Sequence, residues 1–174
     1  MKTMTKRLAA LLLSLLLLVT FVACAEQETT PSDHESDQQK ESAYSVICNG
    51  TKLELGKPAT AALKKLGEAS SKQEVADCGA GNSRVYYRYP SFDLYTMKSA
   101  DGTEIIDQIE LNDDLVQTPE GIGIGSTEAE LRDAYGAPAS DKNGVLTYQK
   151  GSYQLIAELT DGVVTELGLL RVTQ

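Results

Sequence analysis

Apolar and polar residues alternate along six short segments of the chain between residues 83 and 170. A period of two residues is typical of a strand that has one face against a core and the other toward water. Pairs such as Asn143-Gly144 and Asp161-Gly162 favour the tight turns that close antiparallel hairpins. We therefore predict antiparallel strands at residues 83–89, 92–97, 104–111, 145–148, 153–159 and 163–170.

Two further segments place apolar residues at the three- and four-residue spacing of a helix. Pro58 and Gly67 suit the first turn and the end of the first helix, and Thr127 with Glu130 forms a capping box at the start of the second. Both apolar stripes are narrow, so each helix is expected to cover part of a sheet. The stripes are Ala59, Ala62, Leu63 and Leu66 in the first helix and Leu131, Ala134 and Tyr135 in the second.

The two halves of this region also resemble each other in sequence. Residues 56–69 can be aligned with residues 125–138, because both run from a glycine through a short helix to a second glycine. Residues 87–94 align with residues 148–155, and an Asp-Gly pair follows each. We therefore predict the α+β fold class, with a tandem repeat of a short helix packed on an antiparallel β-sheet meander. The two repeats are expected to form one continuous sheet platform and to span residues 44–113 and 114–174.

The start of the chain has the three-part layout of a bacterial secretory signal. Three basic side chains precede an apolar run over residues 8–22, and Ala23 and Cys24 follow it. A small residue directly before a cysteine is typical of a lipoprotein signal, which is cut so that the cysteine carries lipid. We predict a signal peptide at residues 1–23 and a lipid-anchored location on the extracytoplasmic face of the cell membrane. The alternative is an uncleaved anchor, although the run is shorter than the about 20 residues that span a bilayer.

Residues 24–43 hold the lipidated cysteine and an acidic linker rich in Glu, Gln, Ser, Thr and Asp. A segment of this composition cannot bury enough apolar surface to order itself, so we predict a disordered linker. The linker contains His34, the single histidine of the chain. This placement argues against a histidine-based catalytic triad and against a zinc site built on histidines, since both need imidazoles fixed in a folded site.

The charge of the chain limits its partners. The formal net charge is −9, and it becomes −12 when residues 1–23 are removed, because that segment carries three basic and no acidic side chains. A chain this acidic repels phosphate backbones, so nucleic acid is not expected as a partner. It also repels anionic headgroups, which leaves the lipid on Cys24 as the expected contact with the membrane.

Two cysteines, Cys48 and Cys78, remain once Cys24 is lipidated. An even pair in an oxidising compartment favours a disulfide, which here would clamp the first helix and could stabilise the fold by about 3 to 4 kcal/mol. The alternatives are two unpaired thiols or a redox-active couple. Redox couples are usually closely spaced at the start of a helix, and these two cysteines are far apart.

Two other motifs are weaker evidence of a functional site. Gly121, Gly123 and Gly125 lack the third glycine spacing of a dinucleotide fingerprint, so a turn leading into a helix is expected. Residues 112–114 (Asn-Asp-Asp) lack the spaced carboxylates and closing Glu of a calcium loop, and a solvated turn explains them as well. We predict no metal and no cofactor.

The aromatic segment that begins at Tyr86 is the strongest candidate for a binding surface. Tyr87 and Tyr89 should lie on one face of their strand, with Tyr86 and Arg88 on the other. Exposed Tyr together with Arg is typical of binding hot spots, whereas tyrosines at the edge of a core would have no such role. The candidate partner-binding residues are Tyr86, Tyr87, Arg88, Tyr89, Tyr148 and Tyr153.

Several of these segments together resemble a known group of proteins. Asp77-Cys78, the Val-Tyr-Tyr-Arg-Tyr run at residues 85–89, the Thr-Pro-Glu-Gly-Ile-Gly-Ile-Gly run at residues 118–125 and Tyr135-Gly136 resemble a family of uncharacterised lipoproteins from Gram-positive bacteria. The predicted pair of helix-on-sheet repeats is similar in topology to the β-lactamase inhibitory protein and to small outer-membrane assembly lipoproteins. The first resemblance implies an extracytoplasmic lipoprotein, and the second supplies the analogy for an inhibitor of a secreted enzyme.

The leading hypothesis is a lipid-anchored binding or envelope-assembly module, and not an enzyme, that acts through an exposed aromatic sheet face. Its partner would be an unknown envelope or extracellular protein. One alternative is a proteinaceous inhibitor of a secreted enzyme. Another is a cell-surface hydrolase that uses paired carboxylates, since acidic residues are plentiful in the chain.

Overall fold

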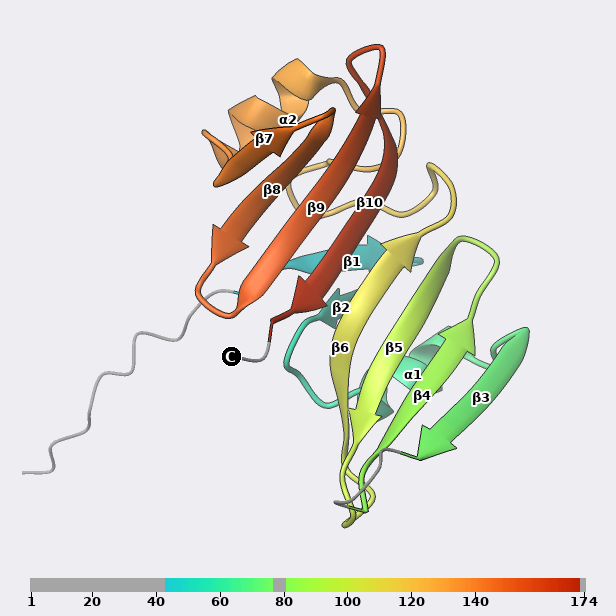
Figure 1. Cartoon of the computed structure of the whole chain (residues 1–174). Coiled ribbons are helices and arrows are strands. Elements are labelled where there is room, and N and C mark those ends of the chain that lie inside the picture. The colour runs from blue at the N-terminus through green and yellow to red at the C-terminus, as the bar shows by residue number, and fades with distance from the viewer. Residues whose placement is uncertain (1–42, 77–80, 173–174) are drawn as a thin grey trace, which may run out of the picture. The chain divides into compact units, whose positions relative to one another are not determined.

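A computed structural model describes residues 43–76 and 81–172 of the chain (Figure 1). Strands dominate these residues, at 51% against 12% for helices. The described elements are β1 (Ser45–Cys48), β2 (Thr51–Glu54), α1 (Thr60–Leu66), β3 (Ser71–Ala76), β4 (Ser83–Arg88), β5 (Phe92–Lys98), β6 (Glu104–Leu111), α2 (Glu128–Tyr135), β7 (Ser140–Lys142), β8 (Val145–Lys150), β9 (Tyr153–Thr160) and β10 (Val163–Arg171).

Eight of the described strands form one antiparallel sheet in the order β3-β4-β5-β6-β10-β9-β8-β7, and β1 and β2 form a separate hairpin. The sheet therefore joins two four-stranded meanders through the pairing of β6 with β10. The first meander consists of β3, β4, β5 and β6, and the second of β7, β8, β9 and β10. That junction is short, because it aligns three residue pairs, Glu110 with Gly168, Ile109 with Leu169 and Gln108 with Leu170. The neighbouring β9–β10 pair aligns eight.

The predicted α+β class with a tandem helix-on-sheet repeat is wrong, because the described residues are mostly β. The helices have only seven and eight residues, about two turns each, and are too short to make a layer comparable to the sheet. The β1–β2 hairpin also has no counterpart among the described residues after β6. The prediction failed because it gave two short helices the weight of a repeated helical layer, whereas strands make up most of the described residues.

The local predictions of helix and strand positions were more successful. In α2, the Thr127 hydroxyl accepts from the Glu130 backbone N–H while the Glu130 carboxylate accepts from the Thr127 backbone N–H, which confirms the capping box. The position before α1 is Ala59, which offers no side-chain cap. Both helices end at a glycine with positive φ, 79° at Gly67 and 76° at Gly136. The six predicted strands correspond to β4, β5, β6, β8, β9 and β10.

One face of the sheet is covered and the other is open. The two helices and the β1–β2 hairpin lie behind the sheet in Figure 1, and we call that side the covered face. Its residues form one continuous core, and burying each large apolar side chain contributes roughly 1.5–3 kcal/mol. The fully buried side chains of this face include Val85, Leu94, Ile109, Leu155 and Leu169. The opposite side, which faces the viewer in Figure 1, is called the open face below.

Candidate functional site

The structure places four of the six candidate partner-binding residues on the covered face. Tyr87, Tyr89 and Tyr148 are only 7%, 6% and 2% exposed. Tyr153 is half-buried and packs with the core, where its hydroxyl lies against Gly56. These four side chains therefore cannot contribute to an exposed aromatic face. The alternation of the strands was predicted, but the face that the helices cover was not.

The buried tyrosines have structural partners instead. The Tyr87 hydroxyl donates to the Glu104 carboxylate at 2.7 Å, and burial together with this bond raises the Tyr87 pKa. Tyr89 stacks on Phe92 with ring centroids 4.8 Å apart. Tyr148 packs against the ring of Tyr135 at 5.5 Å. Their role is to build the core under the helices.

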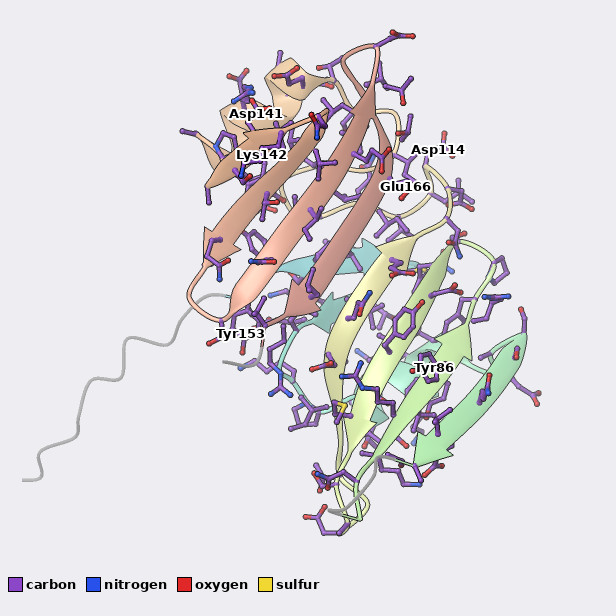
Figure 2. All side chains as sticks on the ribbon, viewed as in Figure 1. Tyr86, Asp114, Asp141, Lys142, Tyr153 and Glu166 are labelled. Atoms are coloured by element: carbon purple, nitrogen blue, oxygen red, sulfur yellow. The ribbon has the colours of Figure 1, made fainter. Side chains whose placement is uncertain are left out.

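Tyr86 and Arg88 lie on the open face, over the first meander. The Tyr86 ring meets the Tyr95 ring edge to face, with centroids 5.1 Å apart, and Figure 2 shows Tyr86 on the side of the sheet away from the helices. Arg88 forms an ion pair with Asp93 at 3.3 Å. The Tyr95 hydroxyl donates to Glu110 at 2.8 Å, and burial followed by this bond raises the pKa of Tyr95 to about 12. These side chains border a shallow depression of about 170 Å³.

A larger depression, of about 560 Å³, lies on the open face at the junction of the two meanders. We call it the junction depression. Its apolar lining includes Val145, Ile156 and Leu170, and Ile124 joins it from the segment before α2. Glu110, Glu158 and Glu166 also line it. Apolar side chains on the water-facing side of a sheet are unusual enough to mark a contact surface when they gather at one place.

Gly168 makes room for the junction depression. It lies in β10, between Glu110 of β6 and Ile156 of β9. A Cβ atom added at Gly168 would have the Ile109 carbonyl oxygen as its nearest neighbour, at 4.0 Å. Sterics therefore do not demand glycine here, and glycine within a strand weakens the strand. Such a glycine often marks a place where a ligand or another backbone approaches closely.

A β-bulge shapes the same region. The register of β10 against β9 shifts between Val164 and Glu166, which leaves Thr165 as the extra residue. The Thr165 hydroxyl donates to the Glu158 carbonyl oxygen at 3.2 Å. Bulges redirect side chains and are common beside functional sites. The bulge and Gly168 together make β10 the least regular strand next to the junction depression.

The carboxylates around the junction depression lack cationic partners. Glu158 and Glu166 occupy directly opposed positions on β9 and β10, and both are exposed. Glu110 accepts from Tyr95 and from the Gln108 amide at 2.6 Å, both neutral donors. Among the described side chains, no Lys or Arg nitrogen lies within 4.0 Å of these three carboxylates. Like charges placed opposite each other on neighbouring strands destabilise a sheet.

The other predicted sites are placed as follows. Cys48 is buried, and burial and then Asp113 raise the pKa of its thiol. Its predicted disulfide partner Cys78 lies outside the described residues, as do Cys24, His34 and the signal peptide at residues 1–23. The lipidation and the disulfide therefore stay predictions. Neither of the described helices is long and apolar enough to cross a membrane. Within residues 43–76 and 81–172, no three metal-ligating side chains gather at one place.

Sequence reasoning missed the junction depression, although some signals for it were present. Leu155, Ile156 and Ala157 are three apolar residues in succession, so a strand there must turn one of them to the open face. Gly168 interrupts a predicted strand, which is a known sign of a bulge or a close approach. The opposition of Glu158 and Glu166 had no such signal, because it depends on the register beyond the bulge.

Comparison with known proteins adds little to this picture. The sequence matches no known protein family and no curated protein. The described fold is similar to part of a crystal structure of a cysteine-rich secretory protein from Staphylococcus aureus subsp. aureus Mu50, with 14% sequence identity and a TM-score of 0.48. That match covers 67% of this chain and 43% of the other.

Proposed function

We propose that this chain is a lipid-anchored binding protein of the extracytoplasmic face of the cell membrane. The layout of residues 1–24 supports the anchor, since a basic start, an apolar run and an Ala-Cys pair are typical of lipoprotein signals. Binding, rather than catalysis, is supported by the open face, where apolar and charged side chains line a depression in one continuous sheet. The partner would be an envelope or extracellular protein that docks on this face.

The observation that carries the proposal is the junction depression on the open face. Val145, Ile156 and Leu170 are half-buried there, and each leaves part of its apolar surface in contact with water at one place between the meanders. A residue cluster of this kind loses unfavourable contact with water when a partner covers it. The candidate surface therefore moves from the buried tyrosines to the junction between the meanders.

The anchor is tested by metabolic labelling with radioactive palmitate in the native host. The wild-type chain is expected to incorporate label and to fractionate with membranes, whereas Cys24→Ser should lose the label. Cys48→Ser is the matched control, because it removes a cysteine that the signal does not use. A wild-type chain without label would contradict the anchor.

The binding surface is tested by photo-cross-linking in intact cells. A benzoylphenylalanine residue at Thr165 would sit at the rim of the junction depression, and one at Lys65 would sit on the exposed side of α1. Thr165 is expected to give a discrete cross-linked product and Lys65 is not. Equal products from both positions, or none from Thr165, would count against a partner on the open face.

A further inference from the structure

The junction depression indicates the chemistry of its occupant, on the assumption that the proposed function is correct. Three carboxylates, Glu110, Glu158 and Glu166, line it, and no basic side chain does. Elsewhere on the described surface, carboxylates such as Asp93 and Asp107 have Arg partners within the chain, Arg88 at 3.3 Å and Arg171 at 3.0 Å. Other carboxylates, such as Asp114, Asp133 and Asp161, have no basic partner within 4.0 Å in the described part of the chain either, so what distinguishes the junction is that three such carboxylates gather around apolar side chains.

The apolar floor narrows the choice further. Val145, Ile156 and Leu170 lie among the carboxylates, so a small hydrated cation would leave this surface uncovered. A complementary occupant combines positive charge with apolar groups. A lysine or arginine side chain flanked by apolar side chains has both, because its stem packs on apolar surface while its head reaches a carboxylate.

The extent of the depression suggests an extended segment. All but two of its lining residues, Asn112 and Ile124, come from the four adjacent strands β6, β10, β9 and β8. Neighbouring strands lie about 4.8 Å apart, so the site spans roughly 14 Å, the length of about four extended residues. The absence of a side chain at Gly168 lets the backbone of such a segment approach the middle of the site.

Two occupants that this protein could itself supply, residues 24–43 and a second copy of the chain, are unsuitable. Residues 24–43 are long enough to reach a surface, but they contain six acidic residues against one lysine. A second copy that presented the same depression would bring three more carboxylates to the first three. Both would increase the repulsion at the site, so charge favours a different protein.

We propose that the junction depression binds an extended segment of a partner protein in which a lysine or arginine stands between apolar side chains. The basic group pairs with Glu158 and Glu166, and the apolar side chains cover Ile156 and Leu170. Binding relieves the repulsion between the two opposed carboxylates and fills the space above Gly168.

The test selects ligands for the full mature chain, purified in detergent, from a displayed library of random decapeptides. Enriched sequences are expected to carry an excess of Lys or Arg next to apolar residues. Enrichment of neutral or acidic sequences, or no enrichment at all, would overturn the proposal. If Thr165 still gives a cross-linked product in cells, the proposed function survives that result and only the partner chemistry fails.

Variants then locate the binding of the enriched peptides by fluorescence anisotropy. Gly168→Leu fills the depression, and the Glu158→Gln/Glu166→Gln double variant removes charge without changing shape. Both should raise Kd at least tenfold. The control Glu68→Gln/Asp133→Asn removes the same charge from exposed helix-side positions and should change Kd less than twofold.

Salt and folding complete the test. Raising the salt concentration should weaken wild-type binding several-fold and affect the Glu158→Gln/Glu166→Gln variant much less, because the ion pairs are gone. Each variant is first checked for the wild-type far-UV circular dichroism spectrum. If a variant is misfolded, Gly168→Ala and the single Glu166→Gln replace it. Equal Kd values for folded site variants and the control would overturn the proposed site.

Discussion

The open faces of the two meanders differ in how far their side chains satisfy one another. Over the first meander, Tyr86 packs on Tyr95 and Arg88 pairs with Asp93, so these aromatic and charged groups have partners within the chain. Beside the second, Glu158 opposes Glu166 and Ile156 remains in contact with water. Both meanders share one sheet and one core. Under the proposed function, unmatched groups, and not the backbone architecture, would mark the surface that a partner covers.

This comparison also changes the weight given to aromatic residues. Tyr86 was a candidate for the binding surface because exposed tyrosines are common at interfaces, and Tyr95 lies beside it on the open face. In the structure their rings contact each other, and the Tyr95 hydroxyl donates a hydrogen bond to the Glu110 carboxylate. The site moves instead to residues of ordinary appearance, a glycine and two glutamates, whose arrangement is unusual.

The largest expected effect tests whether the two meanders form one cooperative unit. Leu94 in β5 and Leu155 in β9 are both fully buried on the covered face. Leu94→Ala and Leu155→Ala should each lower the free energy of unfolding by about 2–5 kcal/mol in urea denaturation. Because β6 pairs with β10, each variant should still unfold in one transition. Two separate transitions would show that the meanders fold independently and would weaken the comparison.

The next largest effect is expected in alkaline solution. Burial is the main cause that raises the pKa of Tyr95 and of Tyr44 to about 12. Tyr95 lies over the first meander, and Tyr44 packs against Tyr135 of α2. A raised pKa stabilises the fold fully below the unfolded value of about 10, and this contribution is lost as the pH rises from about 10 to 12. Each tyrosine should account for roughly 1–2 kcal/mol after allowance for solvent screening.

Chemical denaturation at pH 8 and pH 11 measures this effect. Tyr44→Phe and Tyr95→Phe should each lose less stability between the two pH values than the wild-type chain does. A pH dependence unchanged in Tyr95→Phe, alongside a reduced one in Tyr44→Phe, would mean that the hydroxyl of Tyr95 is well solvated. Polar groups on the open face of the first meander would then bond more to water, and less to one another, than the structure indicates.

A smaller effect distinguishes the helices that cover the two meanders. Thr127→Ala removes the capping box of α2 and should lower stability by about 1 kcal/mol. Thr60→Ala is the matched control, because α1 begins at Thr60 after an Ala59 that supplies no side-chain cap. It should be close to neutral in thermal unfolding. A comparable loss in both variants would argue against a specific role for the cap.

The sequence was a good guide where a local rule decides the outcome. Thr127 with Glu130 placed the start of α2, and alternation placed β4, β5, β6, β8, β9 and β10, since both signals depend on near neighbours in the chain. The strand β3 was missed because all six of its residues are exposed and so show no apolar alternation. The short edge strand β7 was missed for a similar reason, with two of its three residues exposed.

The face of each strand and the partners across the sheet could not be derived in this way. Alternation assigned Tyr87 and Tyr89 to one side, but only tertiary packing decides that α1 covers that side. The opposition of Glu158 and Glu166 requires the pairing of β9 with β10 and the bulge at Thr165. Such information comes from contacts between distant segments, which a single sequence does not encode by spacing.

The smallest expected effect is a gain in stability at the candidate site. Gly168→Ala should raise the free energy of unfolding by about 0.5 kcal/mol, because a Cβ fits there and alanine has less backbone freedom to lose. Gly67→Ala is a useful contrast, since its φ of 79° disfavours alanine and the variant should be destabilised. Differential scanning calorimetry compares them. A destabilised Gly168→Ala would mean that the strand itself needs glycine.

The spare room at position 168 has a consequence for how the gene changes over time. Any glycine codon becomes an alanine or valine codon by a single base substitution, so replacements that suit a strand arise continually by mutation. For alanine, folding alone gives no reason to discard the replacement, since a Cβ atom meets nothing closer than 4.0 Å. Persistence of glycine in closely related genomes would therefore record selection acting on what the protein touches.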